Sequence, residues 1–307
     1  MPRYRAAGVE IDSGLALPGL HAGLAVERPA DVVVRVGATP AELPDALEHG
    51  ANWQRAAGAW LLCVPGLARF LVREAGEIVI DPQGDATPDE LAIFAAGPLL
   101  GMLLHLRGQV VFQASAVAVG GGSALFCGGT SAGKSTLAAA LGRRGHAMIC
   151  DDLCCIDLAA PGGPRALADA ATLKLWAQAI DQLALAPGPP VRQSLRKHHI
   201  APPAGAIAAA PVRAIYLLQE ARPSVPAGIQ RPNVVDLAIL LRRSAYRPNM
   251  VRALGQRPVY FAAAAGLAGA AGVFTFARAH DFGRMDAALD ELEAHWAETG
   301  LARGQAA

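Results

Sequence analysis

The feature that most constrains the fold of this 307-residue chain is the segment GGTSAGKST, which runs from Gly128 to Thr136. Its residues Gly128, Gly133, Lys134 and Ser135 satisfy the pattern G-x-x-x-x-G-K-[ST] of a phosphate-binding loop. Glycines let successive backbone N–H groups turn toward phosphate oxygens, and the following helix directs the positive end of its dipole to the same point. Because such a loop joins a buried strand to a helix, it predicts an α/β core.

Both flanking elements are visible in the sequence. VVFQASAVAV, a GGG turn and SALFC predict a β-hairpin over 110–127 whose second strand leads into the loop. KSTLAAALGRR predicts a helix that Gly145 ends as a left-handed cap. The alternative is a coincidental glycine-rich turn, which is disfavoured because the chain has 33 glycines but lysine only at positions 134, 174 and 197.

The loop therefore predicts a nucleotide site, with ATP and Mg²⁺ as the expected cofactors. Lys134 is expected to contact the β and γ phosphates, and the Ser135 hydroxyl is expected to ligate the metal. The predicted nucleotide-binding residues are Gly128, Gly129, Thr130, Ser131, Ala132, Gly133, Lys134, Ser135 and Thr136.

Two adjacent aspartates, Asp151 and Asp152, follow the predicted helix and a short strand, HAMIC. A strand after the helix is expected to run parallel to the strand before the loop, so the carboxyl ends of both meet at one edge of the sheet. The aspartates would stand at that edge beside the phosphates, before a second short strand, LCCID. One carboxylate can hold Mg²⁺ while the other accepts a proton from an attacking hydroxyl. The alternative is an ordinary turn at a strand end.

The run GTSAGKSTLAAALGRRGHAMICDD is similar to the catalytic core of the HPr serine kinase/phosphorylase family, in which a phosphate loop, one helix, an RGH turn and a strand ending in DD occur at this spacing. A weaker resemblance to HPr-kinase-related proteins, including serine kinases of lasso peptide maturation, extends through LKLWAQAIDQLAL, RKHHIAPP and APVRAIYLLQE. It covers residues 88 to 290. The resemblance implies the mixed-sheet P-loop fold shared with phosphoenolpyruvate carboxykinase. It also implies catalytic and metal-associated roles for the aspartates, and we assign Asp152 as base and Asp151 as metal-associated, with the reverse left open.

Two positions depart from that family pattern. Gln113 stands where HPr kinases carry a histidine, and a glutamine cannot take up a proton at neutral pH. The glycine-rich signature after the aspartates is replaced by ADAATLKLWAQ. HPr itself is therefore not the expected acceptor.

Two basic segments are candidates for holding the acceptor. RQSLRKHHI would form a flap over the phosphates, in which Arg196 or Lys197 neutralises developing charge. RRSAYRPN would bind a peptide carboxylate through Arg243 or Arg247. For both segments the alternative is a solvated basic loop.

The sequence predicts two domains, a small β-rich domain over 1–85 and a P-loop kinase domain over 86–307. Thr87, Pro88 and Glu90 form a helix start signal, so a helix is expected from Pro88 to His105. The uncharged stretch Ala92 to Leu104 is too short to span a bilayer, and Val259 to Ala277 is mostly Ala and Gly, so both are expected to be buried. LKLWAQAIDQLAL is expected to be an amphipathic helix over 173–185.

The net charge of +1 disfavours a nucleic-acid or membrane-surface partner, and we expect a cytoplasmic protein. A homo-oligomer is left open. The predicted function is an ATP- and Mg²⁺-dependent phosphotransferase, a kinase that transfers the γ-phosphate to a hydroxyl. The expected acceptor is a serine of a peptide, such as a lasso precursor peptide, or of a small protein. The alternatives are a small-molecule kinase on the same core and a nucleotide-binding regulatory module without transfer activity.

Overall fold

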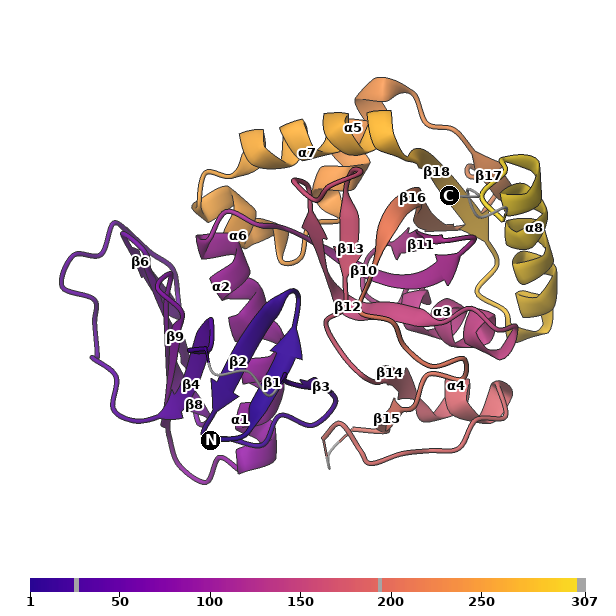
Figure 1. Ribbon diagram of the computed structural model, residues 1–307. Coiled ribbons are helices and arrows are strands. Elements are labelled where there is room, and N and C mark those ends of the chain that lie inside the picture. The colour runs from indigo at the N-terminus through magenta and orange to yellow at the C-terminus, as the bar shows by residue number, and fades with distance from the viewer. Residues whose placement is uncertain (25–27, 193–194, 303–307) are drawn as a thin grey trace. The chain divides into compact units, whose positions relative to one another are not determined.

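The computed structural model describes residues 1–24, 28–192 and 195–302 (Figure 1). The chain divides into two compact units, Met1–Gln109 and Val110–Ala307. Each unit is described by itself.

The first unit is built on a nine-stranded sheet with the strand order β3-β1-β2-β4-β9-β8-β7-β6-β5. Turns between alternating apolar and polar runs make most neighbours antiparallel, whereas β4 lies parallel to both β2 and β9. The β-rich start of the chain is therefore confirmed. The strands are β1 Arg3–Ala6, β2 Val9–Ser13, β3 His21–Ala22, β4 Val32–Val36, β5 Glu48–His49, β6 Trp53–Ala56, β7 Ala59–Val64, β8 Ala68–Arg73 and β9 Glu77–Pro82.

A helical segment completes the first unit. It consists of α1 (Pro88–Phe94), a π-helical turn (Ala95–Leu99) and α2 (Leu100–Leu106). The predicted start is confirmed, because Thr87 and Glu90 form a reciprocal capping box. Phe94 stacks on Phe70 of β8. Because this segment packs with the first sheet, the boundary lies after Gln109 and not near residue 85.

The segment Pro88–Leu106 has 19 residues and a mean hydropathy of 1.4, which by length and composition alone suffices to cross a membrane. The helical segment is longer than the uncharged stretch Ala92 to Leu104, which was expected from the sequence to be too short to span a bilayer. Within its apolar window, 61% is buried inside the protein, as in the core helix of a globular domain.

The second unit contains a mixed sheet with the order β11-β10-β12-β13-β16-β18-β17 and an additional β11–β16 pairing. β16 pairs with β13 through residues 209–211 and with β11 through residues 212–217. The predicted mixed α/β class with a P-loop core is confirmed. The strands are β10 Val110–Val119, β11 Gly122–Cys127, β12 Met148–Asp157, β13 Arg165–Leu167, β16 Ala209–Glu220, β17 Gly228–Gln230 and β18 Gly272–Arg278.

Strand direction gathers several carboxyl ends at one edge of this sheet. β16 is parallel to both β11 and β18. β10 is antiparallel to β11 and to β12, so β12 runs in the same direction as β11, as predicted, with β10 between them. The predicted end of the strand at the aspartates was wrong, because β12 continues through them to Asp157.

Helices cover both faces of the second sheet (Figure 1). Alternate residues of β10 enter two apolar clusters, one packed on α3 (Lys134–Arg143) and α8 (Met285–Glu298), the other on α5 (Val234–Arg243) and α7 (Arg257–Ala270). The stretch 259–277 is thus a helix followed by β18. Helix α6 spans Pro248–Ala253.

The predicted helix over 173–185 was wrong in its first turn. Residues Leu173–Trp176 form strand β14, which pairs antiparallel with β15 (Lys197–Ile200), and only Ala177–Gln182 are helical, as α4. The alternation of apolar and polar residues in LKLW fits a strand with one buried face, and the partner strand supplies the hydrogen bonds.

Candidate functional site

The phosphate-binding loop lies between β11 and α3, as its sequence requires. Gly133 is the N-cap of α3 and adopts φ 79°, a left-handed conformation that glycine adopts without strain. Ser131 also has a positive φ, of 67°, at the top of the loop. The loop residues 129–131 are exposed to solvent.

Lys134 is buried at the base of this loop. Its Nζ donates to the backbone oxygens of Gly128 (3.0 Å) and Gly129 (2.9 Å). Burial lowers the pKa of this amine, while the charges of Asp152 and Asp151 act to raise it. Lys134 is therefore within electrostatic reach of both predicted carboxylates.

The aspartates lie level with the start of the loop. In the strand register, Cys127 at the end of β11 pairs with Ala114 of β10, and Ala114 pairs on its other side with Asp152. Asp151 and Asp152 are not at the end of β12, which continues to Asp157. They are nevertheless level with the end of β11, where the loop begins, because β12 extends beyond the end of β11.

Asp152 has an unusual backbone conformation, although the pairing of β12 with β10 is regular at this residue. Its φ is 91°, a region that non-glycine residues adopt with strain. Its half-buried carboxylate accepts a long hydrogen bond of 3.4 Å from Nε2 of Gln113. Gln113, a predicted substrate residue, is thus placed beside the predicted base.

Asp151 is almost fully buried, with 1% of its surface exposed. One carboxylate oxygen accepts from the Ser115 hydroxyl at 2.7 Å, and the other accepts from the backbone N–H of Lys174 at 2.9 Å. These two bonds fix the side chain in one orientation.

A third carboxylate, Asp169, was not predicted from the sequence. Its two oxygens accept the backbone N–H groups of Asp151 (2.9 Å) and Leu153 (3.1 Å), the residues on either side of Asp152. Burial raises the pKa of Asp169 to about 8, and the nearby charge of Asp151 acts in the same direction. The one signal in the sequence was an acidic residue within the apolar run ALADAATL.

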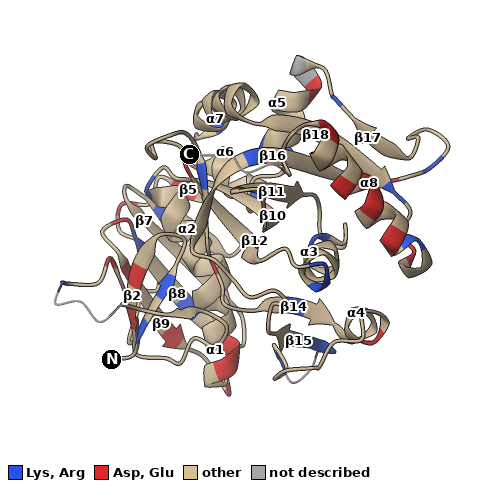
Figure 2. Cartoon of the chain, turned by 45° about the vertical axis from the view of Figure 1, so that its right-hand side comes forward, with Lys and Arg blue, Asp and Glu red and all other residues tan. Residues whose placement is uncertain are grey.

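The two-stranded sheet of β14 and β15 carries basic residues that act on the site, and Figure 2 shows basic positions on both strands. Lys197 lies over the ring of Trp176 at 5.8 Å, and its charge lowers the pKa of Lys134 further. Lys174 acts electrostatically on Asp169. Arg196 is exposed, and its described contact is a backbone hydrogen bond to Ala177.

The second basic segment contributes unequally. Arg247 is exposed and lies over the ring of Tyr246 at 5.8 Å. Burial raises the pKa of Tyr246 to about 12, and the charge of Asp152 adds to this effect. Arg247 thus contacts a tyrosine on which the charge of Asp152 also acts. Arg243, by contrast, is exposed in the last turn of α5.

The side-chain oxygen atoms at this edge are of the kind that Mg²⁺, the metal that a phosphate loop implies, takes as ligands. In the described part of the chain no group of three or more His, Cys, Asp and Glu side chains gathers to form a metal cage. Mg²⁺ is normally held by one or two carboxylates together with phosphate oxygens, so such a cage is not needed. Ser135, in the first turn of α3, and the two aspartates are donors of the required type.

No protein-family model and no curated protein sequence matches this chain. Among solved structures, the chain is similar to the HPr(Ser) kinase/phosphatase from Coxiella burnetii, with a TM-score of 0.34 and 12% identity over 62% of this chain and 92% of that chain. At this TM-score the likeness carries no conclusion about the activity of the present chain.

Proposed function

We propose that this protein is a cytoplasmic, ATP- and Mg²⁺-dependent kinase that phosphorylates a hydroxyl, with a serine of a peptide or small protein as the acceptor. The observation that carries the proposal is the position of Asp152, level with Cys127, the residue that directly precedes the phosphate loop, and electrostatically coupled to Lys134. A general base beside a phosphate cradle is the minimum that phosphoryl transfer requires.

The residues divide the reaction as follows. Lys134 and the backbone N–H groups of the loop bind the β and γ phosphates. Asp152 accepts the proton of the acceptor hydroxyl while the hydroxyl oxygen forms a bond to the γ-phosphorus. The bond between the γ-phosphorus and the oxygen that bridges it to the β-phosphate breaks, which releases ADP. The bond from Gln113 orients the Asp152 carboxylate for this step. When bound by Ser135 and Asp151, Mg²⁺ would neutralise negative charge on the phosphates.

The basic residues around this edge support an acidic or C-terminal region of a peptide as acceptor. Lys197 in β15 acts electrostatically on Lys134, Arg196 directly precedes it, and Arg247 lies over Tyr246. Arginine binds carboxylates in a bidentate manner, which would fix the direction of the peptide. Arg243 would extend this contact along α5.

The test is mass spectrometry of candidate peptides after incubation with ATP and Mg²⁺, with Asp152→Asn as the control variant. Asparagine tolerates a positive φ at least as well as aspartate, so this variant keeps the backbone conformation at position 152 while removing the base. We expect a gain of one phosphate on a serine with the native protein and none with Asp152→Asn. Transfer by Asp152→Asn at the native rate would refute the role of Asp152.

Two other functions use the same site. A small-molecule kinase would show ATP turnover with a hydroxyl metabolite and none with peptides. A nucleotide-binding regulatory module is favoured by Gln113, which cannot take up a proton at neutral pH. In that case Asp152→Asn would leave both nucleotide affinity and the regulated process unchanged.

A further inference from the structure

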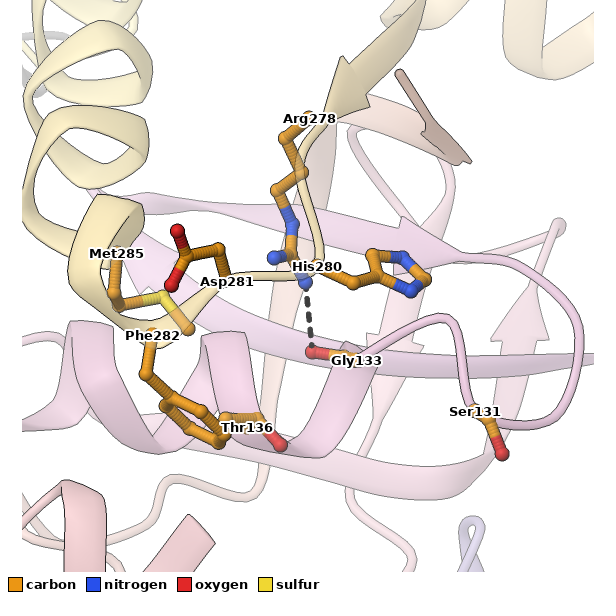
Figure 3. Close-up of a pocket in the computed structure, with 8 residues that line it drawn as sticks. All are labelled: Ser131, Gly133, Thr136, Arg278, His280, Asp281, Phe282 and Met285. Atoms are coloured by element: carbon orange, nitrogen blue, oxygen red, sulfur yellow. Dashed lines mark hydrogen bonds between the residues drawn. The ribbon is translucent and has the colours of Figure 1, made fainter. Parts of the chain in front are cut away.

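A cavity of about 150 Å³ lies beside the phosphate loop, between the first turn of α3 and the segment after β18 (Figure 3). One wall is polar and belongs to the loop and α3. The opposite wall carries the apolar side chains of Phe282 and Met285 together with His280 and Asp281. The lining residues are Ser131, Gly133, Thr136, Arg278, His280, Asp281, Phe282 and Met285.

Arg278 forms the part of this wall that lies closest to the loop. It is 7% exposed, and one of its terminal nitrogens makes long hydrogen bonds to the backbone oxygens of Ala132 (3.3 Å) and Gly133 (3.4 Å). Its Nε is buried without a hydrogen-bond partner. Burial lowers the pKa of Arg278, and no carboxylate of the described chain acts against this shift.

A buried guanidinium without a counter-charge is costly, and proteins normally pair such groups. Asp281 lines the same cavity, but one of its carboxylate oxygens accepts the backbone N–H of Gly283 (2.9 Å) at the start of a short 3₁₀ helix (Phe282–Arg284). The position of Arg278 therefore suits an anion supplied by a ligand.

Topology connects this cavity to the phosphate site. Arg278 is the last residue of β18, which is parallel to β16, which in turn is parallel to β11. The carboxyl ends of these strands share one edge, where α/β proteins bind their ligands. The loop and the cavity are also continuous, because Ser131 and Gly133 belong to both.

We propose that this cavity binds the nucleoside part of the nucleotide, with the base against Phe282 and Met285 and with Arg278 opposite the α-phosphate. The inference rests on the proposed function, since it assumes that the phosphates lie in the loop. Pockets for whole drug-sized ligands measure about 300–1,000 Å³, so a cavity of this size holds one moiety of a nucleotide and not the whole molecule. The Thr136 hydroxyl and the Asp281 carboxylate are the polar groups available to ribose hydroxyls.

The first experiment compares the binding of ATP and of inorganic tripolyphosphate to the full chain by calorimetry, with Mg²⁺ present. We expect Phe282→Ala to weaken ATP binding by at least about fivefold, because stacking of a base on an aromatic ring contributes about 1–3 kcal/mol. Its affinity for tripolyphosphate should not change. The matched control is Phe261→Ala on α7, whose side chain is 67% exposed, and this variant should bind both ligands as the native protein does.

The outcomes separate this inference from the proposed function. Native protein that binds tripolyphosphate as tightly as ATP would overturn the nucleoside site and leave the phosphate loop intact. Native protein that binds neither ligand would overturn the proposed function itself. Unchanged ATP affinity in Phe282→Ala would also overturn the nucleoside site.

Two further measurements remain decisive if Phe282→Ala does not fold. Photolabelling of the native chain with 8-azido-ATP should modify residues within 278–285, and ATP-protected labelling elsewhere would contradict the proposal. Arg278→Met should weaken ATP binding by about tenfold or more, without lowering the unfolding temperature measured without nucleotide. A lower unfolding temperature with unchanged ATP affinity would show that Arg278 only supports the loop.

Discussion

The hydrogen bonds of Asp169 give a prediction about how the strained backbone at Asp152 is held in place. β13 pairs with β12 only at residues 155–157, so the ladder ends before it reaches the aspartates. Beyond that point the Asp169 side chain takes the place of the neighbouring strand and accepts the N–H groups of Asp151 and Leu153. Asp169→Ala removes both acceptors from a region where water has little access.

The magnitude follows from these two bonds. A buried backbone N–H left without an acceptor costs about 1–3 kcal/mol, so Asp169→Ala is expected to lower the free energy of unfolding by about 2–6 kcal/mol. Asp169→Asn retains one acceptor oxygen and should lose about 1–3 kcal/mol. Since domains are stable by only about 5–15 kcal/mol, either loss is easily measured.

The raised pKa of Asp169 adds a pH signature to this prediction. With a pKa of about 8 in the folded protein and about 4 in the unfolded chain, the folded state retains a proton that the unfolded state releases between these values. This contribution to stability is fully present below pH about 4 and is lost as the pH rises through about 8. From pH 5 to pH 7 the free energy of unfolding of the native protein should therefore fall by up to about 2–3 kcal/mol from this group, and the Asp169→Asn variant should not show this decrease.

Urea unfolding of the full chain at pH 5, 7 and 9, followed by tryptophan fluorescence, measures both effects. Asp181→Asn is the matched control, because this carboxylate is exposed on α4. The explanation is refuted if Asp169→Ala unfolds within about 0.5 kcal/mol of the native protein, a change typical of surface sites. It is also refuted if Asp169→Asn shows the same pH dependence as the native protein.

Three further predictions concern the loop and α3. Lys134→Met should reduce ATP affinity by about tenfold or more in calorimetry while the fold is retained, because the methionine fills the same space without the charge that faces the phosphates. Gly133→Ala should lose about 1–3 kcal/mol of stability in thermal unfolding, because an L-residue is strained at φ 79° and its Cβ would lie 2.3 Å from a terminal nitrogen of Arg278. Arg144→Ala should lose about 1 kcal/mol at low salt and less at high salt, because Arg144 bridges α3 to the three α8 carboxylates Asp286, Asp290 and Glu293.

The parts of the fold that were predictable from sequence are those encoded locally. The hairpin of β10 and β11, the phosphate loop, α3 and the capping box at Thr87 each depend on residues a few positions apart, so a short window contains the whole signal. The strand β14 could not be predicted in this way, since its partner, β15, lies beyond α4 and a loop. Likewise, the helical segment 88–106 was assigned to the wrong unit because its packing against the first sheet is a tertiary property.

The site divides along the same line. Lys134 and the aspartates were predicted because they lie close together in one recognisable stretch of sequence. Asp169 was not, because its role is to accept the backbone N–H groups of Asp151 and Leu153 where the pairing of β12 with β13 has ended. Arg278 is 145 positions from Gly133 in sequence and is brought to it by the parallel order of β11, β16 and β18. The motif thus predicts where phosphates would bind, but the groups that we propose to hold a nucleoside, or that hold the backbone at Asp152, come from distant parts of the chain.

The distribution of lysines supports the view that this edge is the functional centre of the second unit. The chain has a net charge of +1, so no excess of positive charge attracts anions to the protein as a whole. Yet all three of its lysines belong to one electrostatic network, because Lys197 acts on Lys134, Lys174 acts on Asp169, and Asp151 acts on both Lys134 and Asp169. Lys134 and Lys197 repel each other, and both would be attracted to a polyphosphate bound at the loop. A pair of cations at the loop of a nearly neutral protein therefore favours a small, highly charged ligand over an extended polyanion.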